Sequence, residues 1–157
     1  MASALAKELS ALGVNAAVLE SDDLRKILTP QPDYSEQERE TFYRTMVYIG
    51  QLLVDHGVPV IFDATANRRL YRDRARKQIA KFLEVYVNCP LAVCMERDAK
   101  GIYRKAQGGG TSTVPGLQVP YEPPERPDMI VSSDRDSPEV AVRKLVSVLD
   151  ARHYLIK

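Results

Sequence analysis

A buried strand is predicted by the continuous apolar run Val58-Pro59-Val60-Ile61-Phe62. A strand covered on both faces reads as an unbroken run of this kind, whereas a half-exposed strand alternates apolar and polar residues. Pro59 stands near the start of the run, where its missing N–H donor is tolerated. Strands of this type belong to parallel sheets whose two faces are packed with helices.

Further apolar runs flank this segment and alternate with helical patterns. Strands are predicted at residues 16–19, 82–87 and 129–131, and helices at 5–12, 21–28, 35–56, 68–81, 90–97, 101–106 and from 137 onward. Regular alternation predicts an α/β fold, with a parallel sheet covered by helices on both faces. The chain shows no internal repeat, so residues 1–157 are expected to form a single domain.

The longest predicted helix begins at Ser35. Ser35 and Glu38 match a capping box, in which the serine accepts from the third amide and the glutamate reaches back. The helix should end near Gly57, a residue suited to a helix C-terminus. Helical spacing places four side chains on its core-facing side: Met46, Ile49, Leu52 and Leu53.

The composition argues against several classes of protein. Basic and acidic residues number 22 and 21, and the net charge of +1 argues against a nucleic-acid-binding protein built on a basic face. No apolar run approaches the roughly 20 residues that cross a membrane. Cys89 and Cys94 are too few for a zinc site or a disulfide framework, so we expect reduced thiols in a cytoplasmic protein.

Carboxylates and arginines follow two of the predicted strands. Asp22 and Arg25 follow the first strand, and Asp63 and Arg69 follow the run quoted above. Ligands bind at the carboxyl ends of parallel strands, where carboxylates can serve phosphoryl transfer and arginines can bind phosphate or sulfate. Asp22 and Asp63 are therefore candidate catalytic residues, and Arg69 is a candidate substrate-binding residue. The alternatives are a helix N-cap for Asp22 and a solvated helix face for residues 68–76.

Two later stretches carry a family resemblance. They are Arg97-Asp98-Ala99-Lys100-Gly101-Ile102-Tyr103 and Pro120-Tyr121-Glu122-Pro123-Pro124. At this spacing the two stretches resemble adenylylsulfate kinases, and the likeness extends from Ala2 to about Leu149. The resemblance implies a P-loop kinase fold. It also implies transfer of the ATP γ-phosphoryl group, with Mg²⁺, to the 3′-hydroxyl of adenylylsulfate in sulfate assimilation. Small nucleotides are the implied substrates, and a homodimer is expected because family relatives are often dimers.

The resemblance also implies roles for single residues. Asp22 matches an aspartate that works with the acceptor hydroxyl and the metal. Arg25 and Arg39 match arginines that hold adenylylsulfate, and Tyr34 matches a phenylalanine that stacks on its adenine. Four residues match the family's lid segment, which continues into the loop 107–127. Arg97 and Lys105 are assigned to binding the nucleotide, and Lys100 and Tyr103 to binding the acceptor.

The P-loop of that family, Gly-x-x-x-x-Gly-Lys-Ser/Thr, does not occur in the 157 residues. In the family it stands directly before the position of Met1, with the central strand of the sheet, so Met1 is interpreted as an internal methionine. Gly108-Gly109-Gly110 is no substitute, because it lacks a lysine and follows no strand. We therefore expect impaired kinase activity and two neighbouring strands with unpaired backbone groups. An inactive nucleotide-binding remnant is one alternative interpretation.

Other departures from the family concern the acceptor. Phe42 replaces an asparagine, Thr65-Ala66-Asn67 replaces Ile-Ser-Pro, and residues 112–116 replace Lys-Gly-Phe-Thr-Gly. In addition, the strand end at Asp63 resembles that of other small P-loop kinases, which act on polynucleotide ends, charged tRNA or small hydroxylated metabolites. A P-loop kinase for another hydroxyl acceptor is therefore the second alternative.

Overall fold

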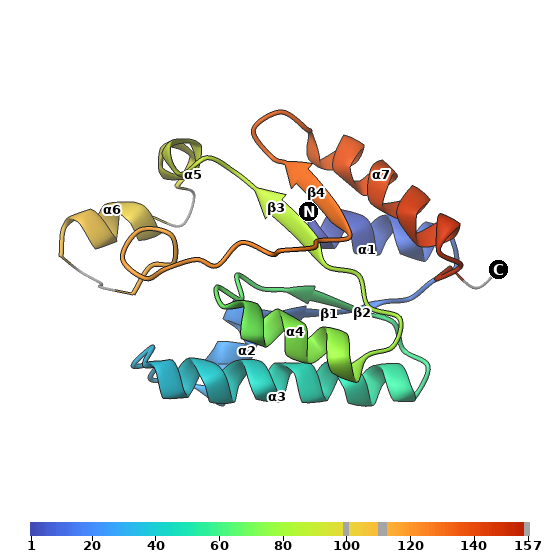
Figure 1. Cartoon of the computed structure of the whole chain (residues 1–157), viewed down its shortest axis with the longest axis horizontal. Helices are drawn as coiled ribbons and strands as arrows, with labels where there is room; N and C mark the ends of the chain where they lie inside the picture. The colour runs from blue at the N-terminus through green and yellow to red at the C-terminus, as the bar shows by residue number, and fades with distance from the viewer. Residues whose placement is uncertain (99–100, 110–112, 156–157) are drawn as a thin grey trace.

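The computed structural model describes residues 1–98, 101–109 and 113–155, and Figure 1 shows their arrangement. Strands and helices alternate along the described residues in the order that the sequence predicts. The strands are β1 (Ala17–Glu20), β2 (Val60–Asp63), β3 (Val85–Asn88) and β4 (Met129–Ser132). The helices are α1 (Ala2–Ala11), α2 (Ser21–Leu28), α3 (Glu36–Asp55), α4 (Arg69–Gln78), α5 (Leu91–Arg97), α6 (Ile102–Gln107) and α7 (Pro138–Ala151).

The strands form two parallel pairs. β1 pairs with β2, from Ala17 opposite Val60 to Glu20 opposite Asp63, and β3 pairs with β4. Within the described residues, no ladder joins β2 to β3. The parallel pairing confirms the α/β prediction, and the open edges confirm that neighbouring strands are left unpaired. Residues 60–62 are only half-buried, rather than fully buried as their apolar run predicts.

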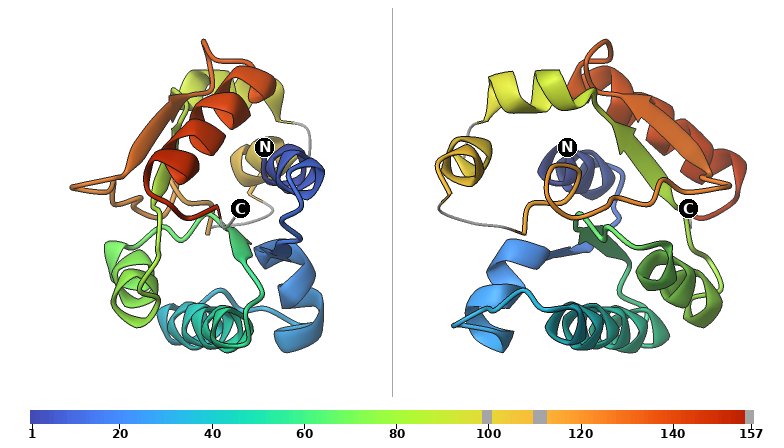
Figure 2. Two further views of the ribbon diagram at one scale, coloured as in Figure 1. Left: turned by 90° about the vertical axis from the view of Figure 1, so that its right-hand side faces the viewer. Right: turned by 60° about the vertical axis from the view of Figure 1, so that its left-hand side comes forward.

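Helices cover both faces of the β1–β2 pair, whereas α7 covers one face of the β3–β4 pair and Ile130 on β4 is 57% exposed (Figures 1 and 2). On one face, α1 and α7 pack together, and apolar side chains of β2, β3 and β4 pack against the core they form, which bridges the two strand pairs. The buried residues of that core are Leu5, Leu9, Val142 and Leu145. On the other face, α3 and α4 cover β1 and β2 around a second core, formed by Phe42, Tyr43, Met46 and Tyr71.

Helix α3 begins and packs through specific local features. The Ser35 hydroxyl accepts from the Glu38 N–H at 3.2 Å, which confirms the predicted cap. The Glu38 carboxylate does not reach back to Ser35; its Oε2 accepts instead from the Asp33 N–H at 2.7 Å. Further along, a Cβ on Gly50 would lie 2.1 Å from Cζ of Phe62. Helix α3 approaches β2 this closely because residue 50 has no side chain.

One expectation about a side chain was wrong, and one alternative interpretation does not hold. Leu52 is 48% exposed, because α3 turns Phe42, Met46 and its other buried residues toward the strands and leaves the Leu52 face outside. The alternative reading of Asp22 as an N-cap also fails. Helix α2 has Glu20 as its N-cap residue and makes no side-chain capping hydrogen bond, so Asp22 lies inside the first turn.

Candidate functional site

The carboxyl ends of the strands point to the side of the molecule where α5, α6 and the start of α3 lie (Figure 1). Glu20 and Asp63 end β1 and β2 directly opposite each other, and Asp22 lies in the first turn of α2. Three carboxylates are thus carried by two neighbouring strand ends. Sequence reasoning selected Asp22 and Asp63 but missed Glu20, although its place at the end of a predicted strand was a usable signal.

Three predicted substrate-binding residues lie together and form what we call the arginine–tyrosine cluster: Arg25, Tyr34 and Arg39. The guanidinium carbon of Arg25 lies 5.1 Å from the centre of the Tyr34 ring, and that of Arg39 lies 5.5 Å from it. Tyr34 is 38% exposed. An accessible ring beside two cations can stack on a base while the guanidinium groups attract an anion.

The backbone at Tyr34 is held in an uncommon conformation. Its φ is +56°, in the left-handed region that few residues other than glycine adopt. The Ser35 N–H donates to Asp33 Oδ1 at 2.7 Å, and Arg39 Nε donates to the Tyr34 carbonyl at 3.1 Å. The Ser35 N–H also holds the pKa of Asp33 below its usual value. These bonds fix the turn that presents the Tyr34 ring.

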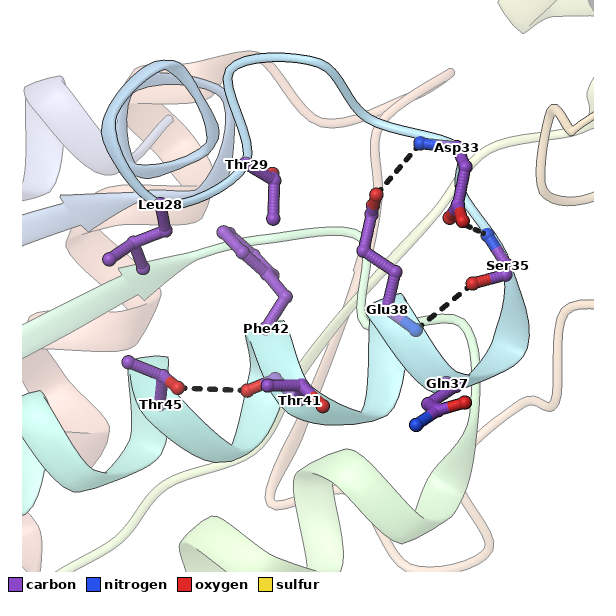
Figure 3. Close-up of a pocket in the computed structure, with 9 residues that line it drawn as sticks. All are labelled: Leu28, Thr29, Asp33, Ser35, Gln37, Glu38, Thr41, Phe42 and Thr45. Carbon is purple, nitrogen blue, oxygen red and sulfur yellow. Dashed lines mark hydrogen bonds between the residues drawn. The ribbon is translucent and has the colours of Figure 1, made fainter.

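Arg25 is oriented by two neighbours on α3. Its Nη1 donates to Glu38 Oε1 at 3.0 Å, and its guanidinium carbon lies 4.0 Å from the centre of the Phe42 ring. Phe42, which replaces a family asparagine, therefore supports Arg25 through a cation–π contact. Glu38 and Phe42 also line a recess of about 400 Å³ together with Thr41, Thr45 and residues before α3, and Figure 3 shows Phe42 between the Leu28–Thr29 segment and α3.

Arg39 joins the cluster to the lid region. Its Nη2 donates to the carbonyl of Thr113 at 2.8 Å, although the two residues are 74 positions apart. Arg39 and the next lid residue, Val114, are both buried, with 7% of each exposed. The segment after residue 112 therefore lies against the arginine–tyrosine cluster.

Comparison with known proteins identifies the family to which this chain belongs. The family model described as "Adenylylsulphate kinase" matches residues 1–132. The chain belongs to the adenylylsulfate kinase family. The adenylyl-sulfate kinase of Rippkaea orientalis is 38% identical over 154 residues, which cover 98% of this chain and 85% of that protein. The adenylyl-sulfate kinase of Gloeothece citriformis is 36% identical over 152 residues, covering 97% and 86%.

A solved structure of an adenylylsulfate kinase matches the fold. The Mycobacterium tuberculosis APS kinase CysC, in complex with AMPPNP and APS, is similar with a TM-score of 0.85 and 31% sequence identity. The match covers 94% of this chain and 90% of that one. These likenesses confirm the fold expected from the resemblance, and they favour the adenylylsulfate kinase family over kinases for other hydroxyl acceptors.

The lid residues expected from the adenylylsulfate kinase resemblance lie along α5 and α6. Arg97 Nη1 donates to the Ser133 carbonyl at 2.8 Å, and Lys105 is exposed on α6. Tyr103 is half-buried, and burial raises the pKa of its hydroxyl. Lys100 lies outside the described residues.

Arg69 does not join the arginine–tyrosine cluster. Its N–H donates to Glu122 Oε2 at 2.7 Å, and its guanidinium group pairs with Glu125. The segment 120–125 therefore engages Arg69 in this structure, and its predicted contact with the acceptor would require these ion pairs to open.

The donor set at the strand ends fits Mg²⁺, as expected for an adenylylsulfate kinase. Among the described residues, no group of three or more His, Cys, Asp or Glu side chains forms a metal cluster. Mg²⁺ is commonly held by one or two carboxylates with water and phosphate oxygens, and the side chains of Glu20, Asp22 and Asp63 are donors of that type. No helix in the described ranges is long and apolar enough to cross a membrane. Both cysteines are free thiols, as predicted.

Proposed function

We propose that this chain binds adenylylsulfate at the carboxyl ends of its strands and holds it for transfer of the ATP γ-phosphoryl group to its 3′-hydroxyl, a transfer that residues 1–157 lack the phosphate-binding loop to complete. The observation that carries the proposal is the arginine–tyrosine cluster. The Tyr34 ring would stack on the adenine, and the guanidinium groups of Arg25 and Arg39 would bind the phosphate and sulfate oxygens. The family membership of the chain supports the same substrate.

The carboxylates at the strand ends would supply the chemistry. Asp22 would accept the proton of the attacking 3′-hydroxyl, since a carboxylate is suited to that role in phosphoryl transfer. Asp63 would complete the oxygen donors for Mg²⁺ beside Asp22. When bound, Mg²⁺ neutralises charge on the phosphoryl oxygens.

The region that includes residues 107–127 would act as a lid over the two nucleotides. Arg97 and Lys105 would then contact ATP, while Lys100 and Tyr103 would contact the acceptor; Arg69 would do so after releasing its glutamate partners. The bond from Arg39 to Thr113 at 2.8 Å supports a lid that closes onto the acceptor site. The free thiols of Cys89 and Cys94 support a reducing, cytoplasmic setting.

Adenylylsulfate binding tests the proposed site through Tyr34. Asparagine tolerates the left-handed backbone at this position, so Tyr34→Asn removes the ring without adding strain. We expect the dissociation constant for adenylylsulfate, measured by titration calorimetry, to rise by about tenfold or more, because a stacked base contributes roughly 1–3 kcal/mol.

Tyr34→Phe is the matched control, because it keeps the stacking surface and should bind within about twofold of the wild type. A wild-type chain that does not bind adenylylsulfate would refute the proposed function. Equal affinity of Tyr34→Asn and the wild type would show that the adenine lies elsewhere.

We also propose that the chain forms a homodimer through the exposed apolar side chains of α2 and α3. Ile27 is 78% exposed, Tyr48 is 63% exposed and Leu52 is 48% exposed. Tyr48 and Leu52 stand one turn apart on α3, and exposed apolar side chains that share a helix face are typical of contact surfaces. Tyr48→Glu should convert the dimer to a monomer in sedimentation velocity, whereas Leu70→Glu, which alters an exposed apolar residue of α4, should not. A monomeric wild type would contradict this proposal.

A further inference from the structure

The two strand pairs are joined on the α4 side by side chains. Within the described residues no backbone ladder connects β2 to β3, yet α4, whose Tyr71 packs in the core against β1 and β2, donates hydrogen bonds to segments beside the other strand pair. Arg72 Nε bonds Glu84 Oε1 at 2.7 Å, just before β3. One turn later, Arg76 donates to Glu84 at 3.2 Å and to Asp128 at 2.7 Å, just before β4.

The three guanidinium nitrogens of Arg72 donate hydrogen bonds to three different segments of the chain. Besides Glu84, its Nη1 donates to the carbonyl of Ala66 and its Nη2 to the carbonyl of Glu122. The side chain is 12% exposed, and its guanidinium carbon lies 5.5 Å from the centre of the Tyr121 ring. A planar guanidinium can serve several acceptors in fixed directions, which a single ammonium group cannot do.

Ala66 lies in a strained segment that we call the β2 turn, residues 64–67. Its φ is +40°, a conformation that costs free energy unless neighbouring groups hold it. Two side chains do so: the Tyr43 hydroxyl accepts the Ala66 N–H at 3.0 Å, and Arg72 donates to the Ala66 carbonyl. The β2 turn directly follows Asp63, and Tyr43 lies one position beyond Phe42 of the acceptor site.

The β2 turn is also bonded to a segment that we call the strap, residues 120–125. Asn67 Nδ2 donates to the Pro120 carbonyl at 3.0 Å, and the Glu122 N–H donates to the Asn67 carbonyl at 2.8 Å. The strap follows the lid segment that contacts Arg39. Arg72 therefore holds together the turn at the end of β2 and the root of the lid.

We propose that Arg72 is a positioning residue for the acceptor site. It fixes the β2 turn and the strap in one arrangement and so presets the space that adenylylsulfate enters, without touching the nucleotide itself. The part of this inference that concerns adenylylsulfate rests on the proposed function. The part that concerns the β2 turn depends only on the contacts of Arg72.

The experiment compares Arg72→Lys with Arg76→Lys in the full chain. Both variants keep the charge, and both arginines contact Glu84, but only Arg72 contacts the β2 turn and the strap. In Arg72→Lys we expect hydrogen exchange at the amides of Ala66 and Glu122 to accelerate by about tenfold or more, since bonds that hold both segments are lost. The dissociation constant for adenylylsulfate should rise by a similar factor, while Arg76→Lys should change neither quantity.

The two readouts separate the two proposals. If Arg72→Lys leaves both exchange and affinity unchanged, or if Arg76→Lys alters them equally, the positioning role of Arg72 is wrong. If the wild type does not bind adenylylsulfate but Arg72→Lys still accelerates exchange at Ala66, the proposed function fails and the positioning role stands. Equal melting temperatures of the two variants would show that general destabilisation is not the cause of a difference between them.

Discussion

A polypeptide of residues 1–157 is expected to transfer no measurable γ-phosphoryl group from ATP to adenylylsulfate. Joining a strand and a Gly-x-x-x-x-Gly-Lys-Ser/Thr loop to its N-terminus should raise turnover by at least about a hundredfold, the effect typical of a single lost electrostatic contact to the reacting group. The loop supplies backbone amides and a lysine for the phosphates. The added strand can pair with the open edges of β2 and β3. Turnover is measured as ATP-dependent phosphorylation of adenylylsulfate.

Two variants of the extended chain serve as controls for this prediction. Replacing the loop lysine with alanine should abolish the gain, and Asp22→Ala should lower turnover by more than about tenfold if Asp22 acts as the general base. Turnover by the 157-residue polypeptide itself would contradict the prediction. Wild-type rates for Asp22→Ala would show that another carboxylate, such as Asp63, serves the acceptor hydroxyl.

Gly50→Ala should destabilise the protein by about 1–3 kcal/mol, the usual cost of overpacking a filled interior. In an ordinary helix interior the same change stabilises by about 1 kcal/mol. The sign is reversed here because the new Cβ would lie 2.1 Å from Cζ and 2.5 Å from Cε1 of Phe62. Urea denaturation of the two proteins gives the difference in unfolding free energy.

A double-mutant cycle with Phe62→Leu checks the cause. The smaller side chain at position 62 leaves room for the Cβ, so Gly50→Ala should cost less in that background, and the two effects should not add. A Gly50→Ala protein as stable as the wild type would mean that α3 does not approach β2 as closely as described.

The order of the elements could be predicted because its signals are local. Ser35 caps α3 through the Glu38 N–H at 3.2 Å, and Gly57 follows the helix with a φ of +81°. Pro138 lies in the first turn of α7, where Ser137 accepts from the Val140 N–H. Each of these signals involves residues within one helical turn, so the sequence displays them directly.

The buried face of α3 was harder to predict. Met46 is 2% exposed as expected, but Leu52 is 48% exposed. Helical periodicity shows which residues share a face, yet several apolar stripes run along α3, and it does not show which stripe the strands cover. The tertiary structure shows it, through the core around Phe42 and Met46 and the close approach of Gly50 to Phe62.

The sequence predicted which residues belong to the candidate site, but not which side chains contact one another there. The sequence, through its resemblance to adenylylsulfate kinases, selected Arg25, Tyr34 and Arg39, and these residues do lie together. The support of Arg25 by Phe42 was not predicted, because Phe42 was interpreted only as the loss of a polar contact. Arg69 was expected to bind the acceptor. Nothing in the sequence around Arg69 indicated that it would pair with Glu122 and Glu125.

The sequence by itself determined the alternation of strands and helices, the family and the residue types at the strand ends. Only the tertiary structure decided the division into two strand pairs and the bonds that join them, such as Arg72 with Glu122 and Arg39 with Thr113. Helix caps and apolar periodicity depend on neighbours in the chain, whereas these bonds link residues 50 and 74 positions apart. The cost of closing such loops changes slowly with their length, so sequence separation does not indicate which distant groups will meet.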